Sequence, residues 1–302
     1  MVNSLLACVC LWLAAPLMLG IINRTKAVMA GRTGAPLLQV YWDIGKLLRK
    51  GFVASRTTTW VFLAGPALCV AAPVFATLLI PVGGQQAVLA FSGDMLLFVS
   101  VLALARFFLA AAAMDTGSAF EGMGGAREVT FAALAEPALL FGMLALTRIS
   151  GSLSLSSMLN LEASAAWRRA SPSVVLIVVS WFIVLLAENA RVPFDDPNTH
   201  LELTMIHEVM VLDHGGPALG FVVYGAALKL TVFAALLSSI LVPASTTAAP
   251  VRAALCIAAI IAIGITVGLI ESSMARLRLV RLPQLLVTAT LLAGFAVVLL
   301  LR

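Results

Sequence analysis

Charge is scarce in this chain. Of its 302 residues only 11% are Asp, Glu, Lys or Arg, whereas a soluble domain carries roughly a quarter. Tyrosines number two and histidines three, while 62% of the residues are hydrophobic and the mean hydropathy is +1.08. Water cannot be the main solvent of such a surface, so a soluble globular protein is excluded. The net charge of +5 does not indicate nucleic-acid binding, because the basic residues stand in short segments beside apolar runs.

The sequence is also poor in motifs that carry chemistry. Its four cysteines, Cys8, Cys10, Cys69 and Cys256, lie in apolar stretches and form no C-x-x-C pair. This spacing argues against an iron–sulfur cluster or a zinc site within the chain. A phosphate-binding loop, a dinucleotide fingerprint and a nucleophile elbow are missing as well. We therefore expect no cofactor, no metal and no catalytic centre in this chain.

Long apolar runs fill most of the sequence, and each is long enough to cross a hydrocarbon core of about 30 Å. They predict an all-α polytopic membrane protein, with residues 1–302 as a single membrane domain of about eight transmembrane helices. The first run has no basic segment before it, so we read it as a retained span. The predicted spans are residues 2–22, 58–80, 93–113, 129–148, 172–188, 217–242, 250–270 and 283–301.

Basic residues predict the orientation of these spans. The segments after odd-numbered spans hold Arg24, Lys26, Arg32, Lys46, Arg49, Lys50, Arg56, Arg127, Arg191, Arg276, Arg278 and Arg281. The opposite side holds Arg148, Arg168, Arg169, Arg252 and Arg302. Because positive residues concentrate in the cytoplasm, both termini are predicted to lie outside it. Residues 23–57 then form a cytoplasmic basic loop for docking hydrophilic subunits, in which Asp43 and Lys46 share a face if the segment is helical.

Three charged residues stand inside apolar runs: Arg106, Glu136 and Lys229. A charge at the bilayer centre costs at least about 2.5–3.5 kcal/mol on insertion scales, so each needs an aqueous path or a partner. A carboxylate at Glu136 would resist ionisation and is a candidate proton carrier. An ion pair that only stabilises the bundle is the alternative. For Arg106 the two interpretations are balanced, whereas the mid-span position of Lys229 favours function.

Residues 188–216 form an acidic segment at the predicted cytoplasmic edge. It contains six of the fourteen acidic residues and all three histidines. Pro193 and Pro197 interrupt any continuous helix, and residues 199–213 are compatible with an amphipathic helix. The segment is interpreted as a proton inlet or a docking surface.

The histidines of this segment invite a metal-site interpretation. His207 and Glu208 begin like the H-E-x-x-H zinc motif, but Val211 occupies the second histidine position. His200, His207 and His214 recur every seven residues and would fall near one helix face. No predicted span contains a histidine, so haem ligation across the membrane is disfavoured and polar or proton-relay roles are favoured.

The run ENARVPFDDPNTHLELTMIHEVMVLDHGGP resembles the signature of the formate hydrogenlyase subunit 4 family, which is similar to the complex I subunit 1 family. GRTGAPLLQVYWDIGKLLRKG, DTGSAFEGMGGAREVTFAALAEPALL and ESSMARLRLVRLPQ extend the resemblance along the chain. It implies an eight-helix subunit that anchors hydrophilic redox subunits and contributes to a proton path. Asn198 and His200 replace two glutamates of the complex I pattern, which speaks against a quinone chamber of that type and favours the hydrogenase branch.

The resemblance also implies partner subunits and a cellular location. The partners would be the large and small subunits of a group 4 [NiFe]-hydrogenase, an iron–sulfur subunit and antiporter-like membrane subunits, in a prokaryotic inner membrane. The [NiFe] centre and the iron–sulfur clusters would lie in those subunits. Two alternatives remain: a quinone-module subunit of an NADH-dehydrogenase-like complex, and a stand-alone ion transporter. The latter would show an inverted repeat with interrupted helices, which the sequence lacks.

Two sets of residues are therefore predicted to be functional. The proton path comprises Glu128, Glu136, Glu188, Glu202, Glu208, Lys229 and Glu271. The coupling and interface set comprises Arg32, Asp43, Lys46, Arg191, Pro193, Phe194, Asp195, Asp196, Pro197 and His200.

Overall fold

A computed structural model describes residues 2–159, 163–195, 205–242 and 249–301, and within these ranges the chain is helical without strands. The first helices are α1 (Val2–Met29), α2 (Gln39–Arg49), α3 (Trp60–Leu79), α4 (Asp94–Asp115), α5 (Ala119–Ser150) and α6 (Leu155–Leu159). They are followed by α7 (Ala163–Glu188), η1 (Glu208–Val211), α8 (Gly216–Leu241), α9 (Ala249–Ser273), η2 (Leu279–Arg281) and α10 (Leu282–Leu299).

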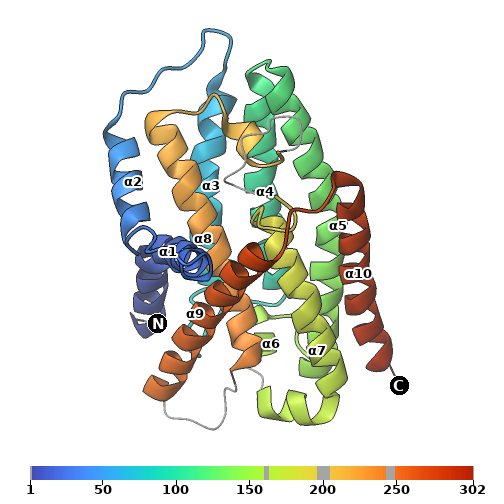
Figure 1. The fold of residues 1–302 in the computed structure, drawn as a ribbon. Coiled ribbons are helices and arrows are strands. Elements are labelled where there is room, and N and C mark those ends of the chain that lie inside the picture. Colours follow the sequence, from blue (N-terminus) through green and yellow to red (C-terminus); the bar gives the residue numbers. More distant parts are fainter. Residues whose placement is uncertain (1, 160–162, 196–204, 243–248, 302) are drawn as a thin grey trace.

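Eight of the described helices are long and apolar enough to cross a membrane, and each overlaps one predicted span. The prediction of an all-α protein with about eight spans is thus confirmed. Both ends of the chain lie toward the lower side of the bundle, whereas the α2–α3 and α4–α5 connections lie on the upper side (Figure 1). Which side is cytoplasmic stays a prediction.

The bundle is organised around α8, the most deeply buried of the spans. Small residues let the helices approach closely, which is how helices pack in lipid. A Cβ at Gly225 of α8 would lie 2.3 Å from the carbonyl oxygen of Cys69 in α3. A Cβ at Gly65 of α3 would lie 2.8 Å from the Cβ of Ala112 in α4. Because these two positions lack a side chain, α3 can pack closely against both α4 and α8.

The predicted docking loop, residues 23–57, is more helical than expected. α1 continues to Met29, because Arg24, Lys26 and Ala27 are good helix formers and no Pro or Gly interrupts residues 23–29. α2 follows and has no buried residue. Asp43 and Lys46 of α2 lie one turn apart with 3.9 Å between Oδ1 and Nζ, so the prediction that they share a face is confirmed.

The fifth span, α7, ends inside the bundle rather than at its upper surface (Figure 1). Its last residue, Glu188, meets side chains from the middle of α4 and the middle of α8. The chain then continues as turns over 189–195. Non-helical backbone at such a depth is tolerated where it lines a polar cavity.

The amphipathic helix expected over 199–213 is wrong where it can be judged. In the described part, residues 205–213, only the short 3₁₀-helix Glu208–Val211 forms. Carboxylates compete for the backbone donors: Asp195 accepts from the N–H groups of Ile206 and His207 at 2.9 and 3.0 Å. Consequently His207 and His214 do not share the face of one helix, and His200 lies outside the described residues.

Candidate functional site: a buried charge network

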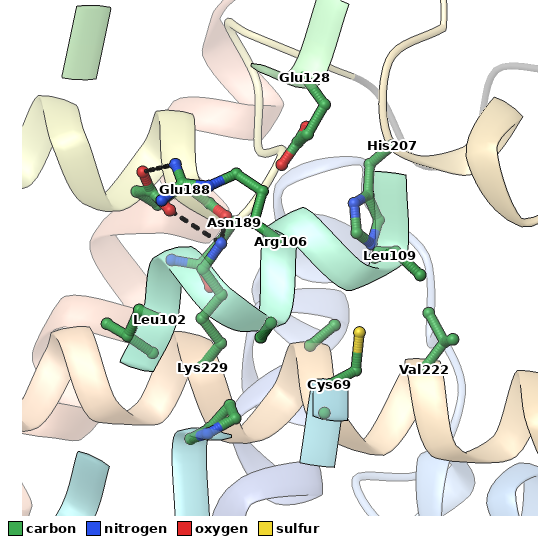
Figure 2. Close-up of a pocket in the computed structure, with 14 residues that line it drawn as sticks. Cys69, Leu102, Arg106, Leu109, Glu128, Glu188, Asn189, His207, Val222 and Lys229 are labelled. Carbon is green, nitrogen blue, oxygen red and sulfur yellow. Dashed lines mark hydrogen bonds and ion pairs between the residues drawn. The ribbon is translucent and has the colours of Figure 1, made fainter. Parts of the chain in front are cut away.

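Four charged side chains from four helices form a continuous network in the middle of the bundle. Nη2 of Arg106 lies 2.9 Å from Oε1 of Glu136, and its Nη1 lies 2.7 Å from Oε1 of Glu188. The other oxygen of Glu188 lies 2.8 Å from Nζ of Lys229. Figure 2 shows Arg106 and Lys229 directed toward Glu188. The order Glu136–Arg106–Glu188–Lys229 alternates in sign, so each neighbouring pair attracts.

The early end of α7 is what brings these residues together. The last turn of a helix leaves carbonyl groups without intrahelical partners and carries partial negative charge. Lys229 supplies both a hydrogen-bond donor and a positive charge at this end of α7. Its Nζ donates to the main-chain carbonyl of Glu188 at 2.5 Å. The side chain of Glu188 is 6% exposed and that of Arg106 is 8% exposed, so their pairing is screened little by solvent.

Glu128 extends the site without joining an ion pair among the described residues. It lines the same cavity as Arg106, Glu188 and Lys229, and it is close enough to Arg106 to act on it electrostatically. His207 faces this cavity as well (Figure 2). With Glu128 included, the site holds three carboxylates, one guanidinium and one lysine amine.

Two cavities lead from this network toward the predicted cytoplasmic side. The inner one, about 50 Å³, has room for water, and its charged lining residues are Arg106, Glu128, Glu188 and Lys229. The outer one, about 500 Å³, is bounded by Asp43 of α2, Arg191 and Glu208. Residues that line both cavities are Asn189, His207, Val222 and Ala226. The two cavities thus adjoin between α2 and the centre of the membrane domain, and Asn189 and His207 are the polar residues that they share.

A second ion-paired group holds the turns after α7 against the end of α9. The fully buried carboxylate of Glu271 lies 2.8 Å from Nζ of Lys26 and 3.4 Å from Nη1 of Arg191. Asp195 lies 3.0 Å from Nη2 of Arg276. In addition, the N–H of Leu277 donates to the carbonyl of Pro193 at 3.1 Å. The segment that forms the outer cavity is therefore fixed to α1 and α9.

Comparison with known proteins agrees with this architecture over the whole chain. A family profile described as NADH dehydrogenase matches residues 2–302. The chain belongs to this family. Formate hydrogenlyase subunit 4 of Escherichia coli (strain K12) is 31% identical over 281 residues, which is 91% of this chain and 90% of that protein. Hydrogenase-4 component C of the same organism is 30% identical over 240 residues, 80% of this chain and 75% of its own.

A solved structure shares the fold. A chain of the membrane-bound sulfane sulfur reductase, an archaeal respiratory membrane complex, superposes with a TM-score of 0.82. The alignment covers 99% of this chain and 98% of that chain at 20% sequence identity. The resemblance to the formate hydrogenlyase subunit 4 family and to complex I is thereby confirmed.

Of the residues predicted for the proton path, the structure brings together Glu128, Glu136, Glu188 and Lys229, and places Glu208 on the outer cavity. Glu271 belongs instead to the group with Lys26 and Arg191. Glu202 lies outside the described residues. The predicted path does not include Arg106, although this residue joins Glu136 to Glu188. Its position inside an apolar run is the sequence feature that indicates a role in the network.

The predicted coupling residues fall into two regions. Arg191, Pro193, Phe194 and Asp195 form the turn after α7, where Phe194 is buried in the core. Asp196, Pro197 and His200 lie outside the described residues. Arg32, Asp43 and Lys46 lie on the exposed segment between α1 and α3. Within the described ranges no three His, Cys, Asp or Glu side chains gather as a metal site would require.

Proposed function

We propose that this chain is the membrane subunit of a formate hydrogenlyase or related energy-converting [NiFe]-hydrogenase, which anchors hydrophilic redox subunits and carries a proton path. The observation that supports it most is the charge network at the buried end of α7, joined by two cavities to the surface beside α2. The relatives named for formate hydrogenlyase and hydrogenase-4 supply the class of complex.

The network suits proton transfer because its charges depend on one another. A proton bound by Glu188 would neutralise the anion that lies between Arg106 and Lys229. Both cations would then act more strongly on Glu128 and Glu136 and favour their ionised forms. One proton entering at the cavity can thus promote release of another at the far end of the network. No step requires a metal in this chain.

Glu136 is the residue from which a proton would leave this network. Its side chain is 35% exposed near the middle of α5, whereas the other members are largely buried. The surrounding α5 face is apolar, with Leu140 and Leu144 exposed at 40% and 48%. A carboxylate facing lipid at this depth would be costly. A second membrane subunit of the antiporter-like class, presenting a polar group to Glu136, would cover this face and receive the proton.

The surface for docking hydrophilic subunits lies at the predicted cytoplasmic side. The segment between α1 and α3 is exposed and basic, and the turn at Arg191–Asp195 lies at the outer cavity. Hydrogenase large and small subunits and an iron–sulfur subunit docked here would bring a redox reaction close to the network. Their [NiFe] and iron–sulfur centres would supply the charge changes, in the inner membrane of a prokaryote.

Mild-detergent purification of the tagged full chain from its native host tests this proposal. We expect a hydrogenase large subunit with its four metal-binding cysteines to co-purify, together with hydrogen-evolving activity. NADH-binding subunits in the complex would favour the quinone-module alternative. A chain that purifies alone and transports ions in liposomes would favour a stand-alone transporter, and either result would contradict the proposal.

A further inference from the structure

An open pocket of about 900 Å³ lies beside the end of α1, away from the charge network. The chain leaves α1 at Met29 and curls back, so that a Cβ at Gly34 would lie 2.4 Å from the Cβ of Ala27. Gly34 adopts a φ of +64°, which a residue with a side chain rarely takes. Arg24 donates to the carbonyl of Thr33 and holds this return in place. The pocket is thus shaped by a defined turn.

The pocket is positively charged. Lys26 and Arg32 line it, and none of its lining residues in the described part of the chain is acidic. The carboxylate that pairs with Lys26, that of Glu271, is fully buried and is shared with Arg191, so two cations face one anion. The side chain of Lys26 is 24% exposed, which places its ammonium between the buried carboxylate and the pocket. Charge in the pocket is therefore incompletely neutralised by the protein.

An apolar stripe leads from the membrane to this pocket. Ile265 and Leu269 of α9 are each 40% exposed, and Ser272, which lines the pocket, follows on the same helix face. The opposite face of α9 is buried in the bundle, where Ile263 is 6% exposed and Val267 is 0% exposed. The stripe therefore faces outward, toward lipid, and ends at the cationic pocket.

We propose that this pocket binds the phosphate of an anionic phospholipid, with the acyl chains lying along Ile265 and Leu269. Arg and Lys are the residues that bind phosphate through charge-assisted hydrogen bonds. Basic pockets between transmembrane helices on the cytoplasmic side suit acidic head groups. A soluble phosphate compound would use the charges but leave the stripe unused. An acidic partner protein is the rival occupant, and it would not need the stripe.

Lipid titration of the delipidated full chain, followed by native mass spectrometry, tests the proposal. We expect one phosphatidylglycerol to be retained where phosphatidylcholine is not, and the soluble head group glycerophosphoglycerol to bind far more weakly. Arg32→Gln should weaken phosphatidylglycerol binding about five-fold, equivalent to about 1 kcal/mol for one basic residue at the membrane surface. Arg32→Lys should keep most of the affinity, because it keeps the charge.

Arg56→Gln is the matched control, since Arg56 is an exposed basic residue of the same segment that does not line the pocket. It should leave retention unchanged. Equal retention of both lipids, or equal effects of Arg32→Gln and Arg56→Gln, would overturn the proposal. So would loss of subunit co-purification in Arg32→Gln with lipid retention intact, since that result would assign the pocket to a protein partner.

Discussion

Lys229 binds Glu188 twice: its Nζ donates to the main-chain carbonyl at 2.5 Å and lies 2.8 Å from the carboxylate oxygen Oε2. One ammonium therefore caps the C-terminal end of α7 and compensates a buried charge. The position of the α7 end and the charge state of the network depend on the same contact. A change in the charge of Glu188 should consequently be felt by the turn at 189–195 that lines the outer cavity.

Replacement of Lys229 by methionine should destabilise the bundle by about 3–5 kcal/mol, because it leaves the Glu188 carboxylate buried with Arg106 alone. Adding Glu188→Gln should recover much of that loss, since the uncompensated charge is then removed. Unfolding of the purified chain in detergent measures both variants. Strictly additive destabilisation in the double variant would show that the two side chains are not coupled.

Gly225 should tolerate no side chain, because a Cβ there would lie 2.3 Å from the backbone oxygen of Cys69. Gly225→Ala should push α8 away from α3 and lower stability by about 1–3 kcal/mol. Gly294→Ala in α10 is the matched control, since nothing lies within 4 Å of the added Cβ. It should be neutral or stabilise by up to about 1 kcal/mol. Equal unfolding temperatures for the two variants would refute the close α3–α8 contact.

Acid should loosen the edge formed by residues 212–215. Burial lowers the pKa of His214 below its ordinary value, opposed in part by its hydrogen bond to Phe62 and by the Asp213 carboxylate. Nε2 of His214 donates to the Phe62 carbonyl at 3.2 Å, and among the described residues nothing bonds its buried Nδ1. The neutral ring thus fits the folded state better than the charged one.

The sign of the pH effect follows from this lowered pKa. As pH falls through about 6.5, the unfolded chain takes up a proton that folded His214 resists, so stability decreases. The decrease levels off below the pKa of the folded state. His214→Phe keeps a ring stacked on Phe62, at 4.1 Å in the native chain, and removes the titration. Its unfolding temperature should depend less on pH between about 5 and 7; an unchanged pH dependence would rule out His214 as the cause.

Orientation is testable with single cysteines in a background without native cysteine. A cysteine at Ser55, in the exposed segment before α3, should react with a membrane-impermeant maleimide only after cells are opened. A cysteine at Gln86, between α3 and α4, should react in intact cells. The reversed pattern would invert the predicted topology and, with it, the side on which redox subunits dock.

Hydropathy alone predicted the number and place of the spans, because an apolar run of about 20 residues has few alternatives to a transmembrane helix. The free-energy cost of a charge inside the bilayer also identified Glu136 and Lys229 as residues that need partners. Both are ion-paired in the structure. The partners were not predictable in the same way. Arg106 joins Glu136 to Glu188 through contacts 30 and 82 residues apart in sequence.

Local structure near residues 205–213 was the least predictable part. The apolar and acidic alternation there is compatible with a helix, but Asp195 accepts from two N–H groups of this segment and Glu121 accepts from the N–H of Asp213 at 2.8 Å. Such tertiary hydrogen bonds override helical periodicity. The ion-pair partners of Glu271 were not predictable for a related reason, because a carboxylate at a span edge gives no sign of which cation it meets.

Proton coupling in the assembled complex tests the central claim most directly. Glu136→Gln keeps an oxygen that accepts from Arg106 but has no proton to exchange, so proton translocation into liposomes should fall roughly tenfold or more. Hydrogen turnover with a soluble artificial donor and subunit composition should stay unchanged. Glu121→Gln, a buried carboxylate of the same helix outside the network, should retain coupling. Undiminished translocation in Glu136→Gln would contradict the proposed path.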